Sequence, residues 1–399
     1  MEKSDEQVPA LVFGGGITGL GVVRNLGRNG VPVYCIVERP DQAIYSKFCK
    51  KCFVVPNIEK NTSILRRFFL DTAKLPSSGV LFPTSDLYSL RLSELRDELG
   101  YDYHPLVPSK TVVETLVEKK MLYRSLSVYK VPHPATFFPT TIGDVEELSI
   151  ELEYPVLVKP SRSQAFWEAF MKKGFKANSA KDLIHYYNLV SRRGIDVVIQ
   201  EVIPGTDKNM YSIAGYFDEY HIPKALFAYH RLRGYPPVFG TSSLIESIPL
   251  SRVNSMKEII EGYLHRLQYY GIMEAEFKLD PRDGAFKLIE INARSWWQNS
   301  LPTKCGINIV LVAYLDALGK ETRYIEDYDE GIRWINFLND VASVVETRPS
   351  VGEWVRSIKK IRDWAYFAAD DLIPWIRSNC LTVREIAKMF YTHTKYKKG

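Results

Sequence analysis

The segment EAEFKLDPRDGAFKLIEINAR, Glu274–Arg294, has the pattern of two strands joined by a tight turn. Asp280–Gly284 indicates the turn, because Asp, Pro and Gly favour chain reversal. Alternate residues of a strand share a face, so Glu290 and Asn292 point the same way, and the turn brings Glu276 opposite Glu290. Two carboxylates and an amide oxygen are ligands that suit Mg²⁺. The alternative is a solvated strand face with alternating charges.

Three basic residues add to this pattern. Arg294 continues the face of Glu290 and Asn292, where its guanidinium can hold a phosphate or a carboxylate, or neutralise the glutamates. Lys159 ends the apolar strand PVLVK, and Lys119 lies on an expected helix. Two lysines facing one cleft would neutralise phosphate groups. Each lysine taken alone is also compatible with an ordinary surface position.

The segment IQEVIPG, residues 199–205, predicts a strand that runs into a Pro-Gly break. The carbonyl of Glu201 and the N–H of Ile203 can pair with an adenine edge, and Pro204 ends that pairing because it has no N–H. Asp207 is close enough in sequence to reach a ribose hydroxyl. The alternative is an edge strand followed by a turn.

The N-terminal segment LVFGGGITGLGVV, residues 11–23, contains the spacing G-x-G-x-x-G, and Glu38 ends the next apolar run. This pattern is typical of dinucleotide sites and leaves open an NAD(P)- or FAD-dependent oxidoreductase. Strands and helices alternate over residues 10–107, which predicts a parallel sheet flanked by helices. Nothing downstream has the pattern of hydride chemistry, so the glycines alone are weak evidence.

The order of these signals resembles the ATP-grasp superfamily over about residues 10–320, and the overall texture is similar to carboxylate–amine ligases of the D-aspartate ligase group. The resemblance implies an α/β fold with a Rossmann-like domain (1–108), an ATP-grasp domain (109–325) with a lid at about 135–205, and a helical C-terminal extension (326–399). It implies ATP ligands, metal ligands and a catalytic pair. The implied ATP ligands are Lys119, Lys159, Ser161, Glu201, Ile203 and Asp207. The implied metal ligands are Glu276, Glu290 and Asn292, and the implied catalytic pair is Arg294 with Lys159.

The activity implied is an ADP-forming ligase that uses ATP and Mg²⁺ or Mn²⁺. A carboxylate becomes an acyl phosphate, and the amine of a second small molecule then attacks it. At least one of the two substrates is expected to be an amino acid. Arg231, Arg233, Gly16 and Trp297 are candidate substrate residues. The loop after Lys159 departs from the superfamily pattern because it contains only one glycine, so a non-catalytic ATP-binding protein is a further alternative.

Composition limits the other classes of protein. A chain of 399 residues predicts two or three domains, and a net charge of +5 without a strongly basic block argues against nucleic acid. The sequence contains no apolar run of about 18 residues, which is the length that would predict a membrane span. The five scattered cysteines, with one C-x-x-C that lacks a second pair, favour a reduced, cytoplasmic protein. A homodimer is compatible with the sequence, which does not fix the oligomeric state.

Overall fold

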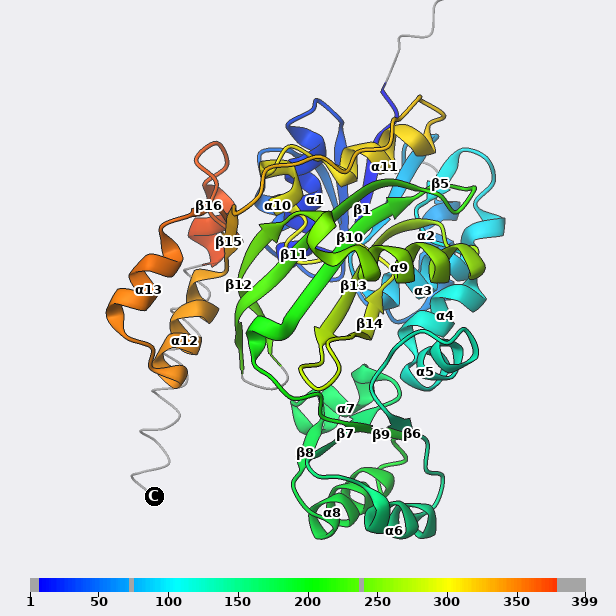
Figure 1. Ribbon diagram of the computed structural model, residues 1–399. Helices are drawn as coiled ribbons and strands as arrows, with labels where there is room; N and C mark the ends of the chain where they lie inside the picture. Colours follow the sequence, from blue (N-terminus) through cyan, green and yellow to red (C-terminus); the bar gives the residue numbers. More distant parts are fainter. Residues whose placement is uncertain (1–6, 72–74, 237–239, 379–399) are drawn as a thin grey trace, which may run out of the picture.

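The computed structural model describes residues 7–71, 75–236 and 240–378, which form three β-sheets and the helices packed on them (Figure 1). The first sheet is parallel, in the order β3-β2-β1-β4-β5. Its strands and the helices that connect them are β1 (Ala10–Phe13), α1 (Gly16–Gly27), β2 (Val33–Val37), β3 (Cys49–Val54), α2 (Thr62–Leu70), β4 (Gly79–Pro83), α3 (Asp86–Leu95) and β5 (Tyr103–Pro105).

Strand β1 is apolar along its whole length because both of its faces are covered. Ala10 and Val12 enter one apolar core with α1, and Leu11 and Phe13 enter another on the opposite face. The first of these cores continues into the largest sheet and the C-terminal segment, so the N-terminal sheet and the largest sheet share apolar packing.

A small antiparallel sheet, in the order β6-β9-β7-β8, lies at the bottom of Figure 1. It has an apolar core of its own. Its elements are β6 (Thr136–Phe137), α6 (Ile142–Glu151), β7 (Val156–Pro160), α7 (Ser163–Phe170), β8 (Phe175–Ala177), α8 (Ala180–Ser191) and β9 (Val197–Glu201). We call this unit the small subdomain; helices α4 (Lys110–Val117) and α5 (Lys119–Val128) precede it.

The largest sheet has the order β14-β13-β10-β11-β12-β15-β16 and occupies the centre of Figure 1. Its antiparallel strands are β10 (Met210–Phe217), β11 (Pro223–Tyr235), β12 (Thr241–Ile248), β13 (Gly271–Leu279) and β14 (Phe286–Asn292). Helix α9 (Asn254–Arg266) joins β12 to β13, and α10 (Ser300–Lys304) and α11 (Ile309–Ala317) follow β14.

The C-terminal segment differs from the predicted helical extension. Two strands, β15 (Arg333–Ile335) and β16 (Ile361–Trp364), extend the largest sheet, and β15 pairs with β12. Helices α12 (Phe337–Thr347) and α13 (Val351–Ile358) lie between them. The predicted helical extension thus contains α12 and α13 and, in addition, strands at 333–335 and 361–364, which the sequence did not predict because their pairing is non-local. Residues 379–399 lie outside the described part of the chain.

A buried ion pair fastens the C-terminal segment to the N-terminal domain. Arg24 on α1 contacts Asp371 at 2.9 Å, and Asp371 also accepts a hydrogen bond from the Ser46 hydroxyl. The more exposed pair of Arg28 and Asp370 lies beside it at 2.8 Å. The C-terminal segment is therefore held against the start of the fold.

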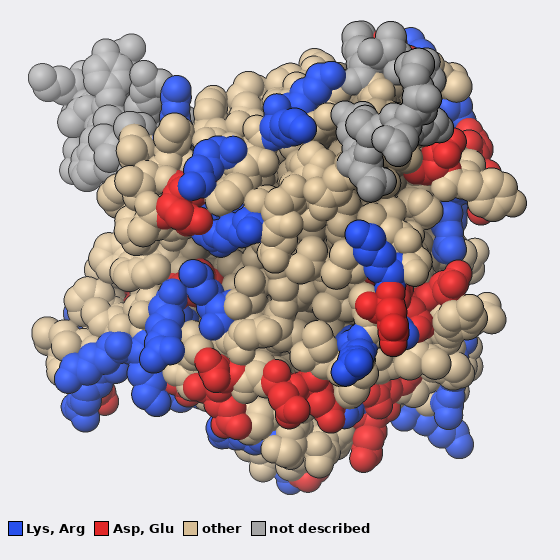
Figure 2. Space-filling view, turned by 90° about the horizontal axis from the view of Figure 1, so that it is seen from above, with Lys and Arg blue, Asp and Glu red and all other residues tan. Residues whose placement is uncertain are grey.

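Charge and hydropathy give two further observations. On the face seen from above, Lys and Arg are interspersed with Asp and Glu (Figure 2). Across the described residues, no helix has both the length and the apolar character needed to cross a membrane. The cysteines in this part of the chain, Cys35, Cys49, Cys52 and Cys305, are free thiols.

Candidate active site

The β13–β14 hairpin forms the centre of the candidate site. In its register Glu276 lies opposite Glu290 and Glu274 lies opposite Asn292. The predicted pairing of Glu276 with Glu290 is therefore confirmed. Asp280 holds the turn, because its carboxylate accepts hydrogen bonds from Arg282 and from the Lys287 ammonium at 2.6 Å.

Glu274 was not predicted from the sequence, although it lies two residues before Glu276 on the same strand face. It is buried and accepts hydrogen bonds from the Tyr229 hydroxyl and, at 2.7 Å, from Nδ2 of Asn292. Since the amide nitrogen of Asn292 is bound in this way, its Oδ1 atom is left to accept the hydrogen bond from Arg294. Glu274 thus orients Asn292.

The carboxylates of the hairpin differ in their electrostatics. Burial, and then the charges of Glu274 and Glu290, raise the pKa of Glu276 to about 8. Burial also acts to raise the pKa of Glu290, but the charges of Lys119, Lys173 and Lys159 outweigh it, so its pKa is lowered. The site therefore holds one carboxylate that is stabilised as an anion and one that needs a further cation.

Among the described residues, no three Asp, Glu, His or Cys side chains lie close enough together to enclose a metal ion. A cation here would bind the carboxylates of Glu276 and Glu290 and the amide oxygen of Asn292, and would take its other oxygens from water or from a phosphate. Mg²⁺ is bound in this way at many phosphate-transfer sites. The donor set therefore fits a cation that arrives with a nucleotide.

Arg294 connects the hairpin to the N-terminal domain. Its guanidinium donates hydrogen bonds to Asn292 Oδ1 at 2.7 Å and to Asp86 at the start of α3, also at 2.7 Å. Burial alone would lower the pKa of Arg294, but the neighbouring Asp86, Glu274 and Glu290 carboxylates raise it. The arginine is therefore a fixed positive charge beside the metal-ligand candidates.

The predicted phosphate ligands meet where α5 begins and β7 ends. The backbone N–H of Lys119 donates to the carbonyl of Ser161 at 3.0 Å, and Lys159 donates to Gln200 on β9 at 2.8 Å. Burial, and then the charge of Lys119, lower the pKa of Lys159 to about 8. Glu276 and Glu290 also act on the pKa of Lys159, so the two lysines and the hairpin share one electrostatic environment.

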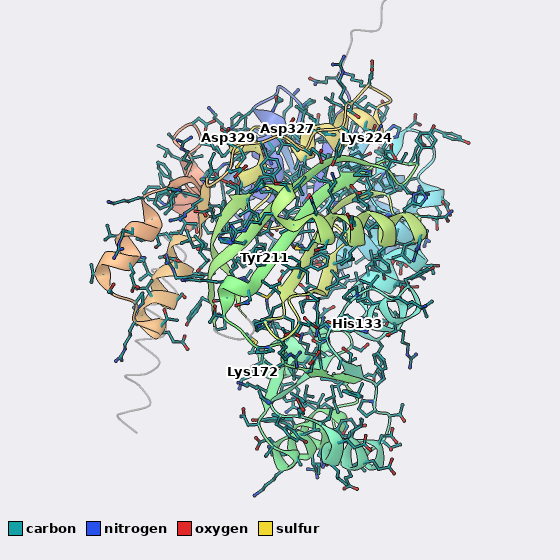
Figure 3. The ribbon with its side chains drawn as sticks, in the orientation of Figure 1. His133, Lys172, Tyr211, Lys224, Asp327 and Asp329 are labelled. Atoms are coloured by element: carbon teal, nitrogen blue, oxygen red, sulfur yellow. The ribbon has the colours of Figure 1, made fainter. Side chains whose placement is uncertain are left out.

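The segment after Lys159 forms helix α7 in place of a glycine-rich loop. Figure 3 shows Lys172 at the junction between the small subdomain and the largest sheet, where its ammonium lies over the ring of Phe175. The neighbouring Lys173 reaches toward the largest sheet, donates to Thr241 at 3.4 Å and lowers the pKa of Glu290. Lys173, in contrast to Lys172, therefore acts on the hairpin.

The predicted adenine hinge follows β9. The Glu201 carboxylate accepts from the Ala135 N–H at 2.9 Å and pairs with Arg282, so this side chain holds the hinge in place. The carbonyl of Ile203 accepts a hydrogen bond from Lys278 at 2.7 Å. Lys278 was not predicted, although it follows Glu276 on the same face of β13. Adenine recognition by the hinge backbone stays a prediction.

Asp207 and Arg231 extend the site along β11. Asp207 accepts from the Gly234 N–H at 2.9 Å and lies 3.8 Å from Arg231. Arg231 in turn lies 3.3 Å from Glu276. The structure therefore joins a predicted ribose ligand, a predicted substrate residue and a predicted metal ligand in one chain of contacts.

Comparisons with known proteins agree with this geometry. No family model matches the chain. D-aspartate ligase from Enterococcus faecium (strain Aus0004) is 24% identical over 323 residues, which are 77% of this chain and 76% of that protein.

Solved structures share the arrangement of the sheets. N5-carboxyaminoimidazole synthetase from Staphylococcus aureus has a TM-score of 0.66 at 13% identity, with 87% of each chain covered. Biotin carboxylase from Campylobacter jejuni has a TM-score of 0.64 at 15% identity, with 82% of this chain and 74% of that chain covered. The chain has the ATP-grasp fold.

L-amino acid ligase from Bacillus licheniformis is a further structural neighbour of this ATP-grasp chain, with a TM-score of 0.60 at 16% identity over 79% of this chain and 75% of that chain. The resemblance inferred from the hairpin and the two lysines is therefore confirmed at the level of the fold.

One substrate candidate of the ATP-grasp chain has a structural role instead. Arg233 makes two hydrogen bonds, of 2.7 and 2.9 Å, to the fully buried carboxylate of Asp340 on α12. Its guanidinium is turned toward the C-terminal segment, whereas Arg231 is turned toward Glu276. We therefore correct the assignment of Arg233 and retain Arg231 as a candidate.

The other two substrate candidates, Gly16 and Trp297, line one cavity of about 430 Å³ in the ATP-grasp chain. Gly16 has φ +61°, a left-handed conformation that favours glycine, and it begins α1. Asp41 occupies the end of that helix: its carboxylate accepts from the Gly16 N–H, and a Cβ on Gly15 would lie 1.9 Å from its oxygens. Since a dinucleotide pyrophosphate would need this helix end, Asp41 argues against the oxidoreductase alternative.

Proposed function

We propose that this chain is an ATP-dependent ligase that joins a carboxylate to an amine. The observation that carries the proposal is the register of β13 and β14, which sets Glu276 against Glu290 beside Asn292 and Arg294, in the electrostatic environment of Lys119 and Lys159. Phosphoryl transfer depends mainly on positioning and on neutralising charge, and these residues supply both.

The proposed reaction has two steps. A carboxylate oxygen attacks the γ-phosphorus of ATP, giving an acyl phosphate and ADP; the amine nitrogen then attacks the acyl carbon, phosphate leaves, and the nitrogen loses a proton. Lys119 and Lys159 would hold the phosphates, and Arg294 would stabilise the charge on the transferred group. A divalent cation, when bound, supplies further neutralisation of the phosphate oxygens.

The names of the similar proteins guide the choice of substrates. One is a D-aspartate ligase, one an L-amino acid ligase, and a 2-oxoglutarate carboxylase domain was solved with MgADP and bicarbonate. We infer that an amino acid serves on at least one side of the reaction here. D- and L-aspartate are the first carboxylates to test, each paired with a panel of amino acids and simple amines.

The test is release of ADP and phosphate from Mg·ATP with these pairs. Glu290→Gln should lower turnover by roughly a hundredfold, because it removes a carboxylate that would hold the cation of Mg·ATP. Thermal stability should change little, because the lost attraction to the lysines is offset by relief of the repulsion from Glu276. Glu147→Gln, on the exposed face of α6, is the matched control and should be unaffected. Stabilisation by NAD(P) and not by Mg·ATP would overturn the proposal.

A non-catalytic ATP-binding protein is the second candidate, and helix α7 is the observation that favours it. Arg162, which precedes α7, pairs with Glu118 at 2.7 Å beside the predicted phosphate ligands. Binding of Mg·ATP with no ADP formed from any substrate pair would support this alternative over the ligase.

A further inference from the structure

The cavity at the start of α1 is built from parts of the chain that are far apart in sequence. The glycine turn, the β4–α3 turn, Trp297 and the C-terminal segment all contribute to it. The C-terminal segment therefore forms one wall of the cavity, and the ion pair of Arg24 with Asp371 holds that segment in place.

The charge of this cavity is acidic. Glu59 is its one charged lining residue within the described part of the chain, which supplies no Lys or Arg to the wall. The Glu59 carboxylate accepts a hydrogen bond from the Ser85 hydroxyl, and no ion pair to it exists among the described residues. Glu38 and Asp86 add negative potential at Glu59, and Lys60, which opposes them, forms its ion pair with Glu168.

The start of a helix ordinarily attracts an anion, but at the start of α1 a carboxylate of the chain itself occupies this position. The Asp41 carboxylate accepts hydrogen bonds from the Gly16 N–H and, at 3.2 Å, from the Ala43 N–H. A phosphate or carboxylate in the cavity would therefore meet Glu59 without a cation and a helix end that already holds its anion. A cationic group would meet a carboxylate, amide oxygens and aromatic rings, all of which attract it.

The cavity also adjoins the candidate phosphoryl-transfer site. Ser85, in the cavity wall, immediately precedes Asp86, which accepts the 2.7 Å hydrogen bond from Arg294. Trp297 follows three residues after that arginine. A substrate in the cavity would thus lie next to the residues that would activate the carboxylate.

We propose that this cavity binds a cationic amino group of the amine substrate, with Glu59 as its counter-ion. The proposal rests on the ligase function proposed above and deepens it, because it assigns a chemical class to one of the two substrates. Trp297, Tyr88 and Tyr366 supply the aromatic surroundings, and Asn336 and Asn339 supply amide oxygens from the C-terminal segment.

The experiment compares probes by calorimetry in the presence of Mg·ADP. Pentane-1,5-diamine should bind the wild-type protein at least about tenfold more tightly than pentane-1,5-diol, because only the diamine offers an ammonium to the carboxylate. Inorganic phosphate should not compete with the diamine. Equal binding of the diol, competition by phosphate, or no binding of the diamine would overturn the proposal.

Variants locate the effect in the cavity. Glu59→Gln should weaken the diamine by roughly tenfold or more, Glu59→Asp should retain most of the binding, and the exposed Glu98→Gln should leave it unchanged. Asn339→Lys places a competing cation in the wall and should also abolish diamine binding. Unchanged binding in Glu59→Gln and Asn339→Lys would refute the assignment. Mg·ADP binding is measured in parallel, and its absence would refute the ligase function instead.

Discussion

At the residue scale, the surroundings of Lys159 determine the charge state of its side chain. Its ammonium is removed from water, lies near a second lysine and donates one hydrogen bond to the neutral side chain of Gln200. Burial and the charge of the second lysine disfavour the charged form, and the single hydrogen bond to a neutral acceptor does not offset them. The residue is therefore a cation whose charge depends on pH in the ordinary laboratory range.

The binding of ATP in the absence of a divalent cation should weaken as pH rises through about 8, the pKa of Lys159. The sign follows because only the protonated amine attracts phosphate: below this pH the amine is charged, and above it the proton must be taken up on binding. The dissociation constant should rise about tenfold between pH 7 and pH 9, measured by titration calorimetry. Lys159→Arg should reduce this dependence because a guanidinium stays protonated, which leaves only the titration of Glu276. The same pH profile in Lys159→Arg would contradict the assignment.

The roles of Glu274 and Arg233 could not be predicted from the sequence alone. The hairpin could be predicted because its turn residues and alternating charges are local signals. Asn292, one partner of Glu274, lies in the same hairpin, but Tyr229 lies 45 residues from Glu274 and Asp340 lies 107 residues from Arg233, so no short pattern contains these contacts. Asp41 is a similar case, since only folding brings its carboxylate onto the glycine turn.

At the scale of elements, β11 is tied to α12 by the pair of Arg233 and Asp340. Asp340 also accepts hydrogen bonds from Ser243 on β12 and from the Trp354 indole on α13. One buried carboxylate thus connects two strands of the largest sheet to both helices of the C-terminal segment. The sequence predicted helices in this region, but strands β15 and β16 depend on pairing that only the complete sheet provides.

Asp340→Asn should destabilise the fold, because it removes the buried carboxylate that is the counter-charge of the half-buried Arg233 guanidinium. A loss of about 3 kcal/mol or more in the free energy of unfolding is expected in urea titrations. Asp370→Asn, which breaks the more exposed pair with Arg28, is the control and should cost less than about 1 kcal/mol. Equal losses in the two variants would show that Asp340 does not connect these elements.

At the scale of the whole molecule, the candidate nucleotide ligands are divided between the small subdomain and the largest sheet. Lys159, Ser161 and Glu201 belong to the small subdomain, whereas Glu276, Glu290 and Asn292 belong to the largest sheet (Figure 1). A nucleotide held by both sets would restrict the motion of one body against the other. The hinge at Val202–Gly205, between β9 and β10, is the segment that would report this restriction.

Hydrogen exchange followed by mass spectrometry should detect the restricted motion between the small subdomain and the largest sheet. Mg·ATP is expected to slow amide exchange in β7, in the hinge and in the β13–β14 hairpin, because these segments hold the candidate ligands. Helices α6 and α8 of the same subdomain carry none of these ligands and should change little. Protection confined to the N-terminal glycine turn would contradict this arrangement and would favour a dinucleotide site.

The separate core of the small subdomain has a consequence for unfolding. Its buried side chains all lie between Val145 and Ile199, whereas the core shared by the N-terminal and largest sheets runs from Ala10 to Ala365. Cooperativity follows packing, so the shared core should melt as one unit and the small subdomain should melt independently. Trp167 on α7 is the one tryptophan between residues 135 and 205, so its fluorescence provides a built-in reporter of that local transition.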